Sequence, residues 1–175
     1  LGAVHNDYGY MLLESGRYPE ALREFETYAR LDPNEPNPYD SQAEVYLIMG
    51  QADRALDRYA QVLKIDPSFS NAHLGRAWSY GLLGQLDSAL QEVELAAKTM
   101  AAQGTPTIGA DALSGFLLMR AGRYREAGAR FRHGKSSAEK FEDPWSFSAF
   151  EFLQSSSDLE RGQLAGIPQA VRRIE

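Results

Sequence analysis

Four columns of similar residues recur at nearly constant intervals along this chain. A small residue recurs with spacings of 34, 34 and 38 residues, at Ala21, Ala55, Ala89 and Ala127. Glycine keeps the same phase at Gly16, Gly50, Gly84 and Gly122. Two further columns hold small residues at Gly9, Ala43, Ala77 and Gly115, and larger ones at Phe25, Tyr59, Val93 and Phe131. A period of this length indicates an array of similar units, each of which buries its apolar face against its neighbours.

Each unit is predicted to consist of two helices. Residues such as Tyr39, Ala43 and Tyr46 follow helical spacing in the first helix. The recurring glycine closes that helix, because glycine readily adopts the left-handed conformation of a helix end. The second helix carries the recurring alanine and is expected to stop at the Asp-Pro pairs 32–33 and 66–67, since proline cannot continue a helix.

These columns resemble the tetratricopeptide repeat (TPR) family over residues 1–136, in the order Gly/Ala, Gly, Tyr-x-x-Ala, Phe/Tyr and Pro. The resemblance implies an all-α, right-handed superhelical solenoid of about four helix-turn-helix repeats followed by C-terminal helices. The sequence departs from the family where an aromatic residue is common, at His5, His73 and Asp111, and the third repeat lacks its final proline.

The repeat phase divides the chain into five expected segments. They are repeats 1–33, 34–67, 68–104 and 105–136, and a C-terminal segment 137–175. The spacing of 38 between Ala89 and Ala127 exceeds the others by about one helical turn, so the second helix of the third repeat is expected to extend into 101–103. The C-terminal segment, with Trp145, Phe147 and Phe150, is either a degenerate fifth pair or a cap, and the cap is favoured because an open stack must cover its last apolar face.

Composition excludes several classes of partner. The net charge is −6 and the pI about 5.1, which argues against nucleic acid because phosphate binding needs a basic surface. The acidic excess lies in residues 1–100, with 8 Lys or Arg against 15 Asp or Glu. Cysteine is absent, and no apolar run reaches the ~18 residues of a membrane span, so no membrane insertion is expected. Because the chain starts at Leu1 without an initiator Met, we expect a piece of a longer protein; a cytoplasmic location is predicted and a periplasmic one is left open.

The resemblance also implies a binding surface, because the first helix of each repeat lines a concave groove that holds an extended peptide or a helix. The repeat phase projects thirteen candidate residues into this groove. They are Asn6, Asp7, Tyr10, Glu14, Asp40, Glu44, Leu47, Leu74, Trp78, Leu82, Leu113, Phe116 and Arg120.

Two features of these positions suggest a ligand class. Tyr10, Trp78 and Phe116 are possible anchors, since interface energy concentrates in large aromatic residues, although they could instead pack between neighbouring first helices. The N-terminal half of the groove is acidic through Asp7, Glu14, Asp40 and Glu44. This favours a protein or peptide ligand with basic and apolar residues, and the alternative is a solvated polar face. Family members that hold an acidic C-terminal tail do so with inward Lys, Arg and Asn residues of the first three repeats. In those repeats this chain has the acidic residues and Ser41 instead, so an acidic tail is a poor candidate.

The sequence gives no sign of catalysis. The three histidines, His5, His73 and His133, are never within metal-ligand spacing of one another, and phosphate-binding loops and nucleophile motifs are missing. We therefore predict a non-enzyme without cofactor or metal. Three functions stay open: a protein-interaction module, a sensory or regulatory segment of a larger signalling or transcription-regulating protein, and a scaffold that self-associates through the aromatic C-terminal segment.

Overall fold

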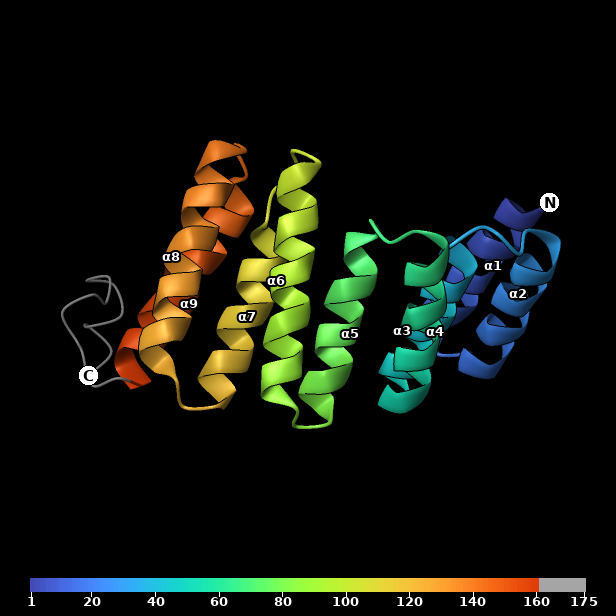
Figure 1. The fold of residues 1–175 in the computed structure, drawn as a ribbon, viewed down its shortest axis with the longest axis horizontal. Helices are drawn as coiled ribbons and strands as arrows, with labels where there is room; N and C mark the ends of the chain where they lie inside the picture. The colour runs from blue at the N-terminus through green and yellow to red at the C-terminus, as the bar shows by residue number, and fades with distance from the viewer. Residues whose placement is uncertain (161–175) are drawn as a thin grey trace. The chain divides into compact units, whose positions relative to one another are not determined.

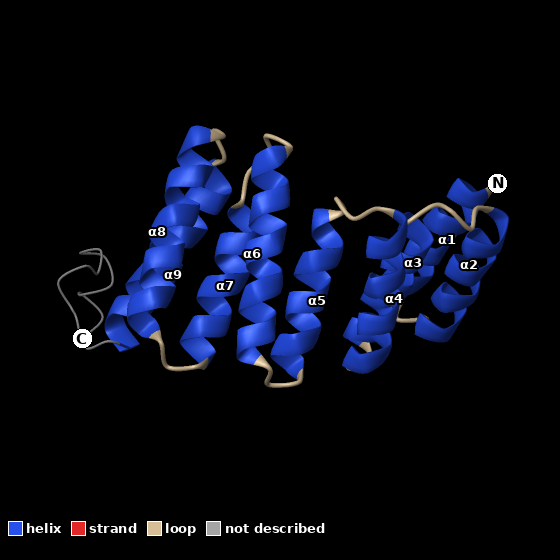
Figure 2. Ribbon diagram, viewed as in Figure 1, coloured by secondary structure: helices blue, strands red, loops and turns tan. Residues whose placement is uncertain are grey.

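A computed structural model describes residues 1–160 of the chain, so the predicted segment 137–175 lies partly outside the described residues. Every regular element in this range is a helix (Figures 1 and 2). The helices are α1 (Gly2–Glu14), α2 (Tyr18–Leu31), α3 (Asn37–Ile48), α4 (Ala52–Ile65), α5 (Ser70–Leu82), α6 (Leu86–Ala102), α7 (Ile108–Arg120), α8 (Tyr124–Lys140) and α9 (Pro144–Glu160). The chain forms two compact units, Leu1–Glu92 and the residues from Val93 on.

Glycine closes the first helix of each hairpin, as the sequence predicts. Gly16, Gly50, Gly84 and Gly122 have φ of 73°, 71°, 73° and 71°, a conformation that is strained for other residues. After α1, the amide of Gly16 donates to the carbonyl of Leu13 at 3.0 Å, which satisfies an otherwise unpaired helix-end carbonyl. The chain can therefore reverse within three residues and begin the second helix.

The recurring small and large residues form the core of the first unit. Ala21, Ala55 and Phe25 are fully buried. A Cβ atom added to Gly9 would lie 2.5 Å from the Phe25 ring, so the small residue of α1 is what admits the large residue of α2. Gly75 of α5 is likewise packed on the Tyr59 ring of α4, and this contact joins successive hairpins.

The same pairing builds the second unit. Gly115 of α7 packs on Phe131 of α8, and Gly134 of α8 packs on Phe150 of α9. The rings of Phe131 and Phe150 lie 6.3 Å apart between their centroids. Helix α9 therefore covers α8 with one of its aromatic residues, while Trp145 and Phe152 of the same helix are 87% and 70% exposed.

Helix α6 has 17 residues, against 14 in α2 and in α4, and it ends at Ala102. The extra length lies at its C-terminal end, where Gly104 (φ 70°) turns the chain toward α7. The loop and the last turn of α6 consequently reach the C-terminal half of α8, where they line a pocket.

A histidine and a carboxylate join the two helices of a hairpin in three places. Nδ1 of His5 lies 2.7 Å from Oε2 of Glu24, and Nδ1 of His73 lies 2.7 Å from Oε2 of Glu92. Both pairs are separated by 19 residues, so they occupy equivalent repeat positions. In the fourth hairpin the carboxylate is on the first helix and the histidine on the second, as Asp111 and His133. These contacts link the two helices of each of these hairpins.

The first helix of the chain exposes an apolar face that later helices bury. Met11 of α1 is 64% exposed, whereas Val45 at the equivalent position of α3 is fully buried. Val4 and Tyr8 extend this exposed face by further turns of α1. The equivalent face of α3 is covered by α2, since Gln42 donates to the carbonyl of Phe25 at 3.3 Å.

Candidate functional site

The first helices of the first unit bring polar groups together between α1 and α3. The Tyr10 hydroxyl donates to Oε2 of Glu44 at 3.2 Å and lies 3.1 Å from Oγ of Ser41. The Ser41 hydroxyl in turn donates to Oδ1 of Asn6 at 3.4 Å. Together with Asp40, these residues form what we call the acidic cluster. The ring of Tyr10 packs edge-on against Phe25, which holds the tyrosine in place.

The acidic cluster holds its negative charge at an energetic cost. Burial, with a contribution from the neighbouring Glu44 carboxylate, raises the pKa of Asp40 from 3.8 to about 6. Asp40 and Glu44 are four residues apart on α3, so they lie on one side of the helix and repel each other when both are ionised. Burial, together with the charge of Asp40, also raises the pKa of Tyr59, the buried tyrosine on which Gly75 packs.

Apolar candidates follow on the same series of first helices. Trp78 of α5, one repeat after Glu44, is 42% exposed, and Leu82 one turn later is exposed as well. Leu47 of α3 and Leu74 of α5 are half-buried. The exposed candidates of α1 are acidic, Asp7 and Glu14. The first unit thus presents exposed carboxylates on α1, the acidic cluster between α1 and α3, and apolar side chains on α5.

The candidates in the second unit behave differently from one another. Phe116 is 42% exposed, and the Arg120 guanidinium lies 6.0 Å from the centroid of its ring. Leu113 is only 4% exposed, so its projection into a binding surface is wrong. The equivalent residues Ser41 and Gly75 are also buried, whereas Asp7 at the same position of α1 is exposed. That Phe116 belongs to the same binding surface as the candidates of the first unit stays a prediction.

Sequence reasoning missed two contributors. The repeat pattern places Tyr59 among the large residues that pack in the core. The charges of Asp40 and Glu44 also contribute to its raised pKa, so Tyr59 lies close to the acidic cluster. The histidine–carboxylate contacts were also missed, although the common separation of 19 residues was a usable signal. Within residues 1–160, no three or more His, Cys, Asp or Glu side chains gather as a metal site would need. None of the helices described in that range combines the length and apolar character that crossing a bilayer requires.

The profile of the tetratricopeptide repeat matches residues 2–36 and 41–105, more than half of the chain. The chain belongs to the tetratricopeptide repeat family. Its fold is the all-α helical repeat solenoid of that family. No curated protein matches the TPR chain in sequence.

Solved structures show the same fold at low sequence identity. A thermophilic TPR protein of Thermus thermophilus superposes with a TM-score of 0.75 at 18% identity, covering 95% of this chain and 86% of that one. MamA of Desulfovibrio magneticus RS-1 gives 0.70 at 17% identity, covering 93% and 86%. The first TPR domain of Spaghetti (RPAP3), bound to the HSP90 peptide SRMEEVD, gives 0.62 at 16% identity, covering 69% and 93%.

Proposed function

We propose that this TPR chain is a non-enzymatic interaction module that binds a peptide or helix along the first helices of its first unit. The ligand presents a Lys or Arg to the acidic cluster and apolar side chains to Trp78 and Leu82. The observation that carries the proposal is the pair of carboxylates Asp40 and Glu44, of which Glu44 accepts a hydrogen bond from Tyr10, with an exposed tryptophan one repeat later.

The acidic cluster supports a cationic group on the ligand. A partly buried carboxylate with a raised pKa has too few partners for its charge, so a Lys or Arg side chain would relieve both the desolvation and the repulsion from Glu44. No Lys or Arg occurs among the candidate positions of α1, α3 and α5 to neutralise the cluster from within.

The same charges argue against an acidic ligand. The TPR domain of Spaghetti is bound to a peptide, SRMEEVD, that carries adjacent glutamates and an aspartate. A peptide of that kind would meet like charges at Asp40 and Glu44, which costs affinity and slows association. We infer that this chain, although its fold is similar, binds a different class of peptide.

We expect Glu44→Lys to weaken binding of such a peptide at least about tenfold, because it places a like charge opposite the ligand cation. Trp78→Ala should weaken binding by a similar or larger factor through loss of an aromatic anchor. The peptide is first selected by display on the immobilised chain, and its affinity is then measured by isothermal titration calorimetry.

The matched control is Glu26→Lys, which makes the same charge change at an exposed position of the second helix α2. It should leave affinity within about twofold, since exposed and distant charges are screened. Selection of acidic peptides, or equal losses from Glu44→Lys and Glu26→Lys, would show that the acidic cluster is not the site.

A further inference from the structure

The second unit contains a pocket of about 370 Å³ between the extended end of α6, the loop that follows it, and the C-terminal half of α8. This volume lies in the range of about 300–1,000 Å³ that small-molecule sites occupy. The pocket exists because α6 runs on to Ala102 and the loop around Gly104 then turns back toward α8. It is separate from the acidic cluster, which belongs to the first unit.

Hydrogen-bond donors line the pocket from one side of α8. His133, Ser136, Ser137 and Lys140 follow one another at positions i, i+3, i+4 and i+7, so the helix presents them on a single face. The lining includes no carboxylate. In a chain of net charge −6, a pocket with an ammonium group, an imidazole and several hydroxyls, but no acid, favours an anion.

Three of these groups have no polar partner among residues 1–157, the residues whose side chains the structure describes. No hydrogen bond is formed there by the hydroxyls of Ser136 and Ser137, and no ion pair by Lys140, whose Nζ lies 5.5 Å from the centroid of the Phe141 ring. Elsewhere on α8, Lys135 is paired with Glu151 at 2.7 Å. The pocket side of the helix therefore keeps its donors available, and Phe141 adds an aromatic wall.

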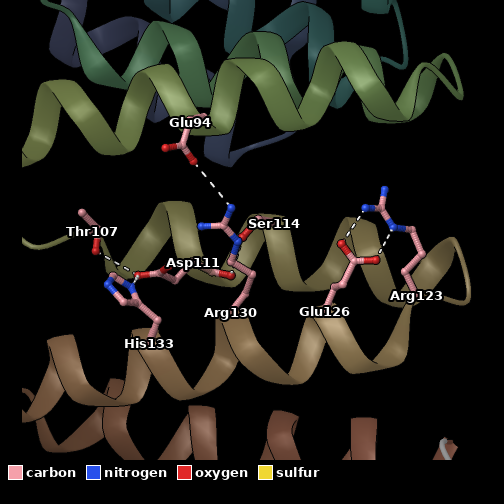
Figure 3. A network of polar contacts seen from close by, with 8 residues as sticks. All are labelled: Glu94, Thr107, Asp111, Ser114, Arg123, Glu126, Arg130 and His133. Atoms are coloured by element: carbon pink, nitrogen blue, oxygen red, sulfur yellow. Dashed lines mark hydrogen bonds and ion pairs between the residues drawn. The ribbon is translucent and has the colours of Figure 1, made fainter.

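The histidine is fixed by a buried carboxylate. Nδ1 of His133 lies 2.9 Å from Oδ2 of Asp111, and the Thr107 hydroxyl donates to the same oxygen at 2.9 Å (Figure 3). Asp111 is only 3% exposed and so cannot itself face a ligand. With Nδ1 held in this way, Nε2 on the opposite edge of the ring is left for a ligand.

We propose that this pocket binds a phosphate group, either free or as the monoester of a small organic molecule. The phosphate oxygens accept hydrogen bonds from the Lys140 ammonium and from the hydroxyls of Ser136 and Ser137. Nε2 of His133 donates to a phosphate oxygen or accepts from a phosphate hydroxyl, according to the protonation of each. An organic group on the phosphate lies against Phe141.

The number of donors decides between phosphate and carboxylate. Four donor-bearing side chains on one helix face exceed what the two oxygens of a carboxylate require, whereas a phosphate monoester offers three terminal oxygens. The pocket volume also leaves room for a small group beside the phosphate.

Calorimetric titration of the whole chain with phenyl phosphate and with inorganic phosphate, at constant ionic strength, tests the proposal. We expect saturable binding that Lys140→Ala weakens at least about tenfold and the double variant Ser136→Ala/Ser137→Ala weakens several-fold. The control Lys135→Ala removes the same charge from α8 outside the pocket and should leave affinity unchanged. Tighter binding of phenyl phosphate assigns the site to an organic phosphate, and equal affinity assigns it to free phosphate.

Absence of saturable binding with both probes would overturn the proposal. Equal weakening by Lys140→Ala and Lys135→Ala would overturn it too, because general attraction to the basic helix would then explain the binding. Thermal unfolding of each variant is measured in parallel, and the hydroxyl variant supplies a second readout that does not depend on charge. Failure here leaves the peptide proposal intact, since the two sites lie in different units.

Discussion

Asp40→Asn is expected to raise the free energy of unfolding at pH 7 by about 2–3 kcal/mol. Burial raises the pKa of Asp40 from 3.8 to about 6, so ionised Asp40 opposes folding. The folded state binds the proton more tightly than the unfolded state, and stability falls as pH rises from about 4 to about 6. The asparagine variant should lose this decline. Urea unfolding between pH 4 and pH 7.5 measures both effects.

The control for this prediction is Asp7→Asn, the same change at an exposed position of α1. It should keep the wild-type dependence on pH, because it leaves the Asp40 carboxylate in place. A wild-type profile that is flat between pH 4 and pH 6 would contradict the burial of Asp40. The expected gain also implies that the acidic cluster is retained at a cost to stability, which is typical of functional sites.

Phe131→Ala is expected to lower the free energy of unfolding by about 3–5 kcal/mol. The ring is fully buried between Gly115 and Phe150, so its removal leaves a cavity in the core of the second unit. Thermal unfolding followed by circular dichroism measures the loss.

Phe152→Ala makes the same substitution on α9 at a position that is 70% exposed. We expect its effect to stay within about 0.5 kcal/mol, as for most surface substitutions. Equal losses of unfolding free energy from Phe131→Ala and Phe152→Ala would show that α9 covers α8 through Phe152 as well as through Phe150. A small loss from Phe131→Ala would contradict the core position of its ring.

Most of the fold could be predicted from the sequence because it follows from local rules that recur. Gly16 and its equivalents mark the end of the first helix in each hairpin. Ala21 and its equivalents mark where the second helix packs closely against the first. Asp143 is also a helix cap, as its carboxylate accepts from the amide of Ser146 at 3.0 Å. Asn37 suggests the same role at the start of α3, but the structure shows no side-chain cap there and the helix begins at Asn37 itself.

The candidate site could be predicted only in part. Repeat phase gives the direction of a side chain around its helix, which was enough to group Tyr10 with Glu44. It does not give depth, and so it placed the buried Leu113 among the exposed candidates. The pocket beside Lys140 depends on the tertiary approach of a lengthened α6 to α8, and no local pattern in either segment contains that information.

The raised pKa of Asp40 makes ligand binding depend on pH. On the proposed function, a proton and the ligand's ammonium or guanidinium group compete for one carboxylate. Acidification through pH 6 would then release the ligand without any rearrangement of the helices. Above that pH, ligand binding would neither release nor take up a proton at Asp40.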